Sequence, residues 1–146
     1  MNRLRPMVVD AIKVKCAIAI DSSNPCIGEI IREMLPAEWQ PHVTVSSYSQ
    51  WTDVIEMVRN ALPALLVIHT NLFLLSPKDG IEHCAAVSSN TRYLFLTAWS
   101  EEHIDDLLKF CEPFHASVLR MPFNRAQLIA ALAGAYGVHY VEDSWL

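Results

Sequence analysis

The chain has 146 residues, of which 52% are hydrophobic and 18% are charged, and its net charge is -5. This length suits one domain that buries a substantial hydrophobic core. The sequence has no clustered Lys/Arg stripe, no apolar run of about 18 residues or more and no secretory signal, so we expect a cytoplasmic protein without a membrane span or direct nucleic-acid binding.

The first third of the chain predicts two strand–helix pairs. Residues 14–20 alternate as a strand, and Asn24 followed by Pro25 suits a helix start. This helix runs to about Leu35, with apolar residues on one stripe: Ile27, Ile30, Ile31 and Met34. Residues 43–45 form a short strand. A second helix begins near Ser49 and directs five residues inward: Trp51, Val54, Ile55, Val58 and Leu62.

The segment Pro63–Thr70 predicts the central strand of the domain. Its four consecutive large apolar residues, Leu65–Ile68, are typical of a strand covered on both faces of a parallel sheet. Ligands of such sheets gather at the carboxyl ends of the strands. His69, which stands at that end, is therefore the most informative residue for function.

The second half continues the alternation. Residues 76–87 predict a helix, 93–97 a strand, and Ser100 caps a helix over 101–111 whose first turn is acidic. A strand over 116–120 follows. Asn124, with Gln127 three residues later, opens a last helix through Ala135, which Gly137 can end. The order βαβαβαβαβα predicts a single α/β domain with a doubly wound parallel sheet.

Four landmarks make this pattern resemble the receiver domain of bacterial two-component response regulators, a flavodoxin-like fold with strand order 2-1-3-4-5. Asp21-Ser22 stands where the family has an acidic pair, and His69 where it has the phosphoryl-accepting Asp. Thr97-Ala98 matches a Thr-Ala pair, and Met121-Pro122-Phe123 matches Lys-Pro-Phe. The resemblance also implies that the Met121-Pro122 peptide is cis.

The resemblance implies a degenerate site, formed by Asp21, Ser22, His69, Thr97 and Met121. Receiver chemistry transfers a phosphoryl group to the Asp with the help of magnesium, which prefers carboxylate ligands. Only one of three acids remains here, and the lysine is replaced by Met121. We therefore expect no phosphorylation, no bound magnesium, no cofactor and no catalysis: a pseudo-receiver lacking the acceptor Asp.

Simpler structural roles remain open for these residues. His69 can be a neutral core histidine with a satisfied ring nitrogen, and Asp21 a loop or capping acid. Thr97 can hydrogen-bond His69 across the old pocket. The scattered cysteines predict reduced core residues, because they lack metal-site spacing: Cys16, Cys26, Cys84 and Cys111.

Three classes of function fit the sequence to different degrees. The first is a phosphorylation-independent interaction module in signal transduction or transcriptional regulation, whose partner is a histidine kinase, a regulator or a second copy in a homodimer. The second is a sensor that binds a small ligand or cofactor in the vacated pocket at the strand ends. An enzyme is the least favoured class, because no nucleophile elbow exists. Candidate partner-binding residues are Leu72, Phe73, Leu74, His103, Leu107, Arg125, Leu128, Tyr140 and Trp145.

The expected organisation is an N-terminal extension (1–12), a receiver-like domain (13–136) and a C-terminal tail (137–146). The whole chain can also be the receiver part of a longer regulator. The tail contains five large apolar residues, Val138, Tyr140, Val141, Trp145 and Leu146. We expect it either to pack on its own domain or to join the Leu72–Leu75 loop or the last helix in an interface.

Overall fold

A computed structural model describes residues 16–70, 77–98 and 100–136, and it contains one five-stranded parallel sheet. The strands are β1 (Cys16–Asp21), β2 (Val43–Tyr48), β3 (Leu65–His69), β4 (Arg92–Thr97) and β5 (Ala116–Arg120). Their order across the sheet is β2-β1-β3-β4-β5, so β3 lies at the centre. The predicted α/β fold with strand order 2-1-3-4-5 is confirmed.

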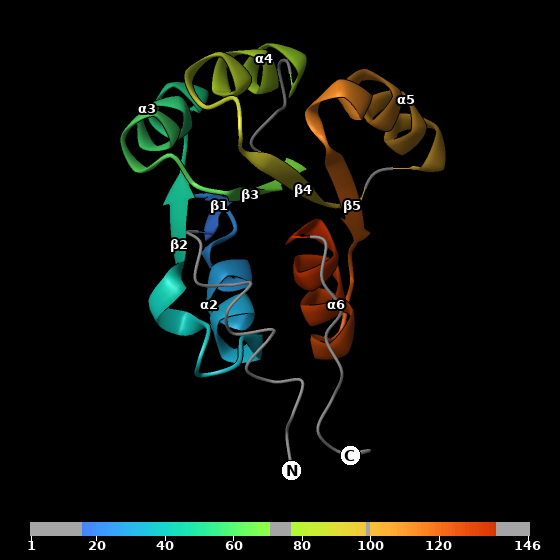
Figure 1. The fold of residues 1–146 in the computed structure, drawn as a ribbon. Helices are drawn as coiled ribbons and strands as arrows, with labels where there is room; N and C mark the ends of the chain where they lie inside the picture. Colours follow the sequence, from blue (N-terminus) through green and yellow to red (C-terminus); the bar gives the residue numbers. More distant parts are fainter. Residues whose placement is uncertain (1–15, 71–76, 99, 137–146) are drawn as a thin grey trace.

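Helices cover both faces of this sheet (Figure 1). They are α2 (Pro25–Met34), α3 (Trp51–Ala61), α4 (Pro77–Val87), α5 (Glu101–Cys111) and α6 (Arg125–Tyr136). Helices α2 and α6 lie on one face, and α3, α4 and α5 lie on the other. Short 3₁₀ helices at Gln40–His42 and Glu112–Phe114 precede β2 and β5. None of the described helices is long and apolar enough to cross a membrane.

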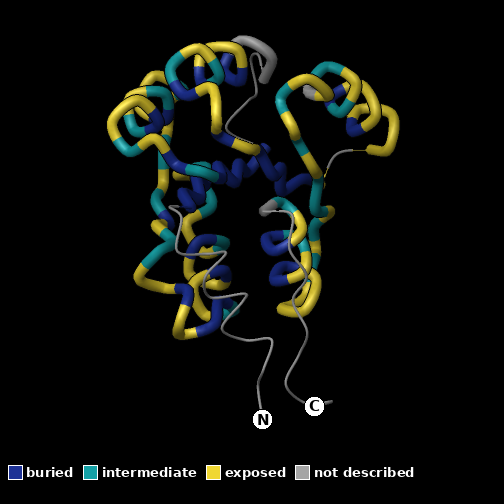
Figure 2. The backbone as a smooth tube through the Cα atoms, viewed as in Figure 1, coloured by how far each residue is buried: buried dark blue, intermediate teal, exposed yellow. Residues whose placement is uncertain are grey.

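The hydrophobic core consists of one layer on each side of the sheet (Figure 2). Side chains alternate along each strand, so Leu65 and Val67 of β3 join the layer under α2 and α6. Leu66 and Ile68 join the layer under α3, α4 and α5. Every residue of β3 is 0% exposed, as the unbroken apolar run predicted.

Two of the three predicted helix caps are confirmed. The Ser100 hydroxyl accepts a hydrogen bond from the His103 backbone N–H at the start of α5. At the start of α6, the Asn124 and Gln127 side chains each accept from the other's backbone N–H at 2.8 Å. The predicted Asn24 cap of α2 is wrong, because its side chain makes no capping bond and donates to Ser23 instead.

Two other details differ from the sequence prediction. Strand β2 extends to Tyr48, three residues beyond the predicted end, because it pairs with β1 along its whole length. Leu62 was predicted to face inward, yet it is 60% exposed and has a left-handed φ of 46°. It follows the last helical residue of α3 and caps that helix by a backbone bond to Val58, so the helical stripe does not extend to it.

Two further expectations concern the loops. The Met121-Pro122 peptide is cis, as the resemblance implied. The Leu72–Leu75 loop, the Gly137 helix end and the tail lie outside the described residues.

The packing of α3 against α4 depends on the absence of a side chain at Gly80. A Cβ at this position would overlap the indole ring of Trp51. We predict that Gly80→Ala lowers the free energy of unfolding by about 1–3 kcal/mol, because the ring or the helix must shift. Urea unfolding measures the change.

Gly134 of α6 provides a matched control, because a Cβ there would meet nothing within 4 Å. Gly134→Ala should instead stabilise the protein by about 0.5–1 kcal/mol, as Ala generally does in an exposed helix. Equal effects of the two substitutions would show that Trp51 does not restrict position 80.

Candidate functional site

The carboxyl ends of β1, β3, β4 and β5 lie at the same edge of the parallel sheet. His69 is the register partner of Leu96, and Thr97 is the partner of Arg120. Immediately after β5, the Met121 backbone N–H donates to the Thr97 carbonyl at 2.8 Å. This edge therefore brings all five predicted site residues to the ends of neighbouring strands: Asp21 and Ser22 at β1, His69 at β3, Thr97 at β4 and Met121 just after β5.

The carboxylate of Asp21 is held within its own loop. One oxygen accepts from the Ser23 backbone N–H at 3.1 Å, and the other accepts from the Ser23 hydroxyl at 2.9 Å. The adjacent Ser22 is exposed, and its backbone N–H donates to the Tyr48 carbonyl. This arrangement agrees with the interpretation of Asp21 as a loop acid.

His69 is fully buried, and neither of its ring nitrogens has a hydrogen-bond partner among the described residues. The expectation of a satisfied ring nitrogen is therefore wrong. Alternation along β3 places His69 in the same layer as Leu65 and Val67, under α2 and α6. The buried residues of that layer are apolar.

Burial determines the charge of His69. Loss of hydration lowers its pKa below the ordinary value of 6.5, and the nearby Asp21 carboxylate acts more weakly in the opposite direction. The ring is therefore neutral at pH 7. A buried neutral imidazole without a partnered carboxylate is not activated as a base or a nucleophile.

Thr97 interacts with Thr70, a residue that the sequence analysis did not single out. The Thr70 hydroxyl donates to the Thr97 hydroxyl at 3.2 Å, and both residues are buried. The proposed Thr97–His69 side-chain bond is wrong, because the His69 nitrogens have no partner among the described residues. Side chains alternate between the two faces of the sheet along each strand. Thr70 and Thr97 therefore lie on the face opposite to His69.

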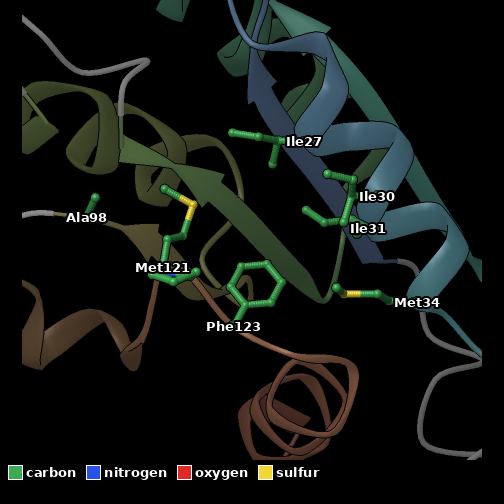
Figure 3. A pocket seen from close by; sticks show the side chains of 8 residues that line it. Ile27, Ile30, Ile31, Met34, Ala98, Met121 and Phe123 are labelled. Atoms are coloured by element: carbon green, nitrogen blue, oxygen red, sulfur yellow. The ribbon is translucent and has the colours of Figure 1, made fainter.

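Met121 lies in the wall of an apolar groove between α2 and the segment that joins β5 to α6 (Figure 3). The groove has a volume of about 340 Å³. Its walls are formed by Ile27, Ile30, Ile31, Met34, Ala98, Met121, Pro122 and Phe123. Sequence reasoning placed the α2 stripe in the core, but Ile30 is 49% exposed. The sequence signal that could have indicated this groove is the stripe of four large apolar residues on the ten-residue helix α2.

These residues do not fit a magnesium ion. Both oxygens of Asp21 bond Ser23, a hydroxyl and an imidazole replace the other two acids, and a thioether replaces the lysine. Within the part of the chain that the structure describes, no group of three or more His, Cys, Asp or Glu residues could hold a metal ion.

The candidate partner-binding residues divide into surface and core. His103 of α5 and Arg125 of α6 are exposed. Leu107 is 4% exposed and Leu128 is 0% exposed, so both pack in the core and cannot meet a partner. Leu72, Phe73, Leu74, Tyr140 and Trp145 lie outside the described residues.

The structure describes the side chains of three of the four cysteines, and the side chain of Cys111 lies outside that description. Cys16 and Cys84 are buried free thiols, as predicted, and burial raises the pKa of Cys84 to about 12, which makes it unreactive. Cys26 is a free thiol as well, but it is exposed, so its assignment to the core is wrong.

The stability of the protein should depend on pH through His69. Its pKa is lower in the folded state than the unfolded value of about 6.5, so the unfolded state binds more protons below that pH. The contribution of His69 is fully present above pH 6.5 and is lost as the pH falls toward the folded pKa. We predict that His69→Leu flattens the decrease in unfolding free energy below pH 6.5, measured by urea unfolding.

The same substitution should leave the protein equally stable or about 1 kcal/mol more stable at pH 7, because it removes an unpaired buried polar group. His83→Gln, at an exposed position of α4, is the control and should leave the pH dependence in place. An unchanged slope in His69→Leu would contradict this account of the buried ring.

Comparisons with solved structures identify the architecture. The receiver domain of an HD domain-containing protein from Pseudomonas fluorescens is similar with a TM-score of 0.67 and 16% identity, over 86% of this chain and 88% of that one. Chemotaxis protein CheY4 of Vibrio cholerae has a TM-score of 0.64 and 15% identity, over 84% and 98%. The sequence itself matches no protein-family model and no curated protein at significant similarity.

A third similar structure contains a bound metal ion. It is the receiver domain of sensor histidine kinase PA1611 from Pseudomonas aeruginosa, with a magnesium ion coordinated in its active-site cleft. Its TM-score is 0.64 and its identity 16%, over 85% of this chain and 98% of that one. At these identities the likeness establishes the fold alone. The chain has the fold of response regulator receiver domains.

Proposed function

We propose that this chain is a pseudo-receiver: a protein-interaction module of bacterial signal transduction or transcriptional regulation that works without phosphorylation. The observation that carries the proposal is the state of His69. It stands at the end of the central strand, where the receiver resemblance places the acceptor Asp, and it is fully buried, neutral and surrounded by an apolar layer.

The surroundings of His69 support the same proposal. Asp21 is engaged by Ser23, and Met121 packs against the core layer of α2 and α6. At the positions that the receiver resemblance assigns to a metal ligand and to the lysine, a phosphoryl group would meet Ser22 and Met121, and neither side chain can balance its charge. These features support the proposal of a receiver architecture without the groups that phosphotransfer requires.

A small-ligand sensor remains the second candidate. The groove that includes Met121 favours it, because a volume of about 340 Å³ lies within the range of small-molecule sites. Its walls are apolar, which suits an apolar ligand better than a phosphate-bearing cofactor.

The proposal predicts no phosphorylation by acetyl phosphate in the presence of magnesium. Intact-mass spectrometry should show no gain of one phosphate, because the acceptor position is a buried imidazole. A known competent receiver, treated in parallel, is the positive control. Magnesium at millimolar concentration should also leave the melting temperature unchanged, since an ion that does not bind the native state cannot stabilise it.

A stoichiometric phosphate adduct that disappears in His69→Ala would overturn the proposal. A clear rise in melting temperature with magnesium would show that Asp21 still takes part in a metal site. Neither outcome would alter the fold.

The charge of α5 indicates the kind of partner. Glu101, Glu102, Asp105 and Asp106 are all exposed on this helix, with Lys109 as the exposed base. Glu101 also forms an ion pair with Arg120 of β5. An acidic surface favours a partner with a basic patch, and such complementarity acts mainly on specificity and association rate.

We therefore predict that Asp105→Lys/Asp106→Lys weakens the association with its partner. The test is quantitative affinity capture from the host, followed by mass spectrometry, with the wild type and the variant compared. Glu29→Lys/Glu33→Lys makes the same charge change on exposed positions of α2, on the other face of the sheet, and is the control. Equal loss in both variants, or no loss in either, would exclude α5 as the docking surface.

A further inference from the structure

The groove between α2 and the segment that joins β5 to α6, called the α2–α6 groove below, is an apolar surface (Figure 3). Ile30 is 49% exposed at its rim, and Met34, Met121 and Phe123 are only partly buried. Leaving such side chains in water forgoes burial energy of roughly 25 cal/mol for each Å² that could be covered. A segment that filled the groove would recover this energy.

The last ten residues of the chain have the composition to fill it. The tail, Gly137–Leu146, lies outside the described residues, and it contains Trp145 and Leu146 at its end. Two methionines in the groove suit an aromatic occupant, because thioether sulfur makes favourable contacts with aromatic rings. The groove volume of about 340 Å³ is small, so it suits one or two large side chains instead of a whole helix.

The tail follows α6 directly and is long enough to reach the groove. Tyr136 is the last residue of α6, and α6 starts at Arg125, two residues after the groove residue Phe123. Twelve helical residues span about 18 Å, whereas ten extended residues span up to about 33 Å. The tail can therefore return along α6 and bring its terminal residues to the level of Phe123.

We propose that the tail binds in the α2–α6 groove of its own domain, with Trp145 between Ile30 and Met121. This inference depends on the groove and the tail. It does not depend on phosphorylation or on the chemistry of His69.

The test uses the full-length protein with isotope-labelled methionine and isoleucine methyl groups. Trp145→Ala should shift the methyl resonances of Ile30, Met34 and Met121, because an aromatic ring next to them is lost. Ile30→Lys should in turn shift the indole resonance of Trp145. Leu62→Lys changes the other large exposed apolar residue, which does not line the groove, and should leave that indole resonance unchanged.

A synthetic peptide of residues 137–146 provides the second arm. Added to a protein truncated after Tyr136, it should restore the methyl resonances of the full-length protein, and a Trp145→Ala peptide should bind at least about tenfold more weakly. Light scattering on the full-length protein should give a mass that does not depend on the tail.

Three results would overturn the proposal. Methyl resonances that are unchanged in full-length Trp145→Ala would show that Trp145 is not in the groove, whether or not the truncated protein folds. Shifts that depend on protein concentration, together with a dimer that becomes a monomer in Trp145→Ala, would assign the tail to a second copy. Shifts caused only by removing residues 1–15 would assign the groove to the other end of the chain.

Discussion

Exclusion of water from β3 is the constraint on which the structure depends. The strand lies at the centre of the sheet, its five residues are 0% exposed, and helices cover both of its faces. A strand in this position must be apolar, and the residue at its carboxyl end must either be solvated by the site around it or remain uncharged. His69 remains uncharged, because burial favours the neutral imidazole.

The altered residues around His69 are consistent with this constraint. A charged Asp in the place of His69 would need positive charges nearby. The receiver resemblance implies an acid that binds a metal ion and a lysine, but this chain has Ser22 and Met121 at those positions. Asp21 bonds Ser23, and Met121 contributes to an apolar wall. The thioether, which would be inert in phosphotransfer, suits a groove whose other walls are aliphatic or aromatic.

Periodicity and capping patterns were sufficient to predict the strands and helices along the chain, and the strand order came from the receiver resemblance. The Leu65–Ile68 run identified the central strand, and the Asn124–Gln127 pair located the start of α6, because these signals are local and depend on few neighbours. Predictions that depended on tertiary neighbours were less accurate. Leu107 and Leu128 were assigned to a surface, although helical spacing turns both toward the sheet.

The contacts of the predicted site residues differ from the expected ones. The sequence placed His69 and Thr97 at adjacent strand ends, yet their side chains point to opposite faces, and Thr97 bonds Thr70 instead. The half-exposed position of Ile30 was also not predictable from the α2 stripe alone. It follows from the space between α2 and the β5–α6 connection, which only the assembled fold defines.

The protonation state of the His69 ring tests the central claim most directly. Nitrogen-15 NMR of the histidine rings between about pH 4.5 and 8 would follow it. This account predicts that the His69 ring is mainly neutral at pH 6.5 and becomes mainly protonated only at lower pH. A His69 ring that becomes protonated at or above pH 6.5 would contradict it, because the end of the central strand would then be a polar, charged site.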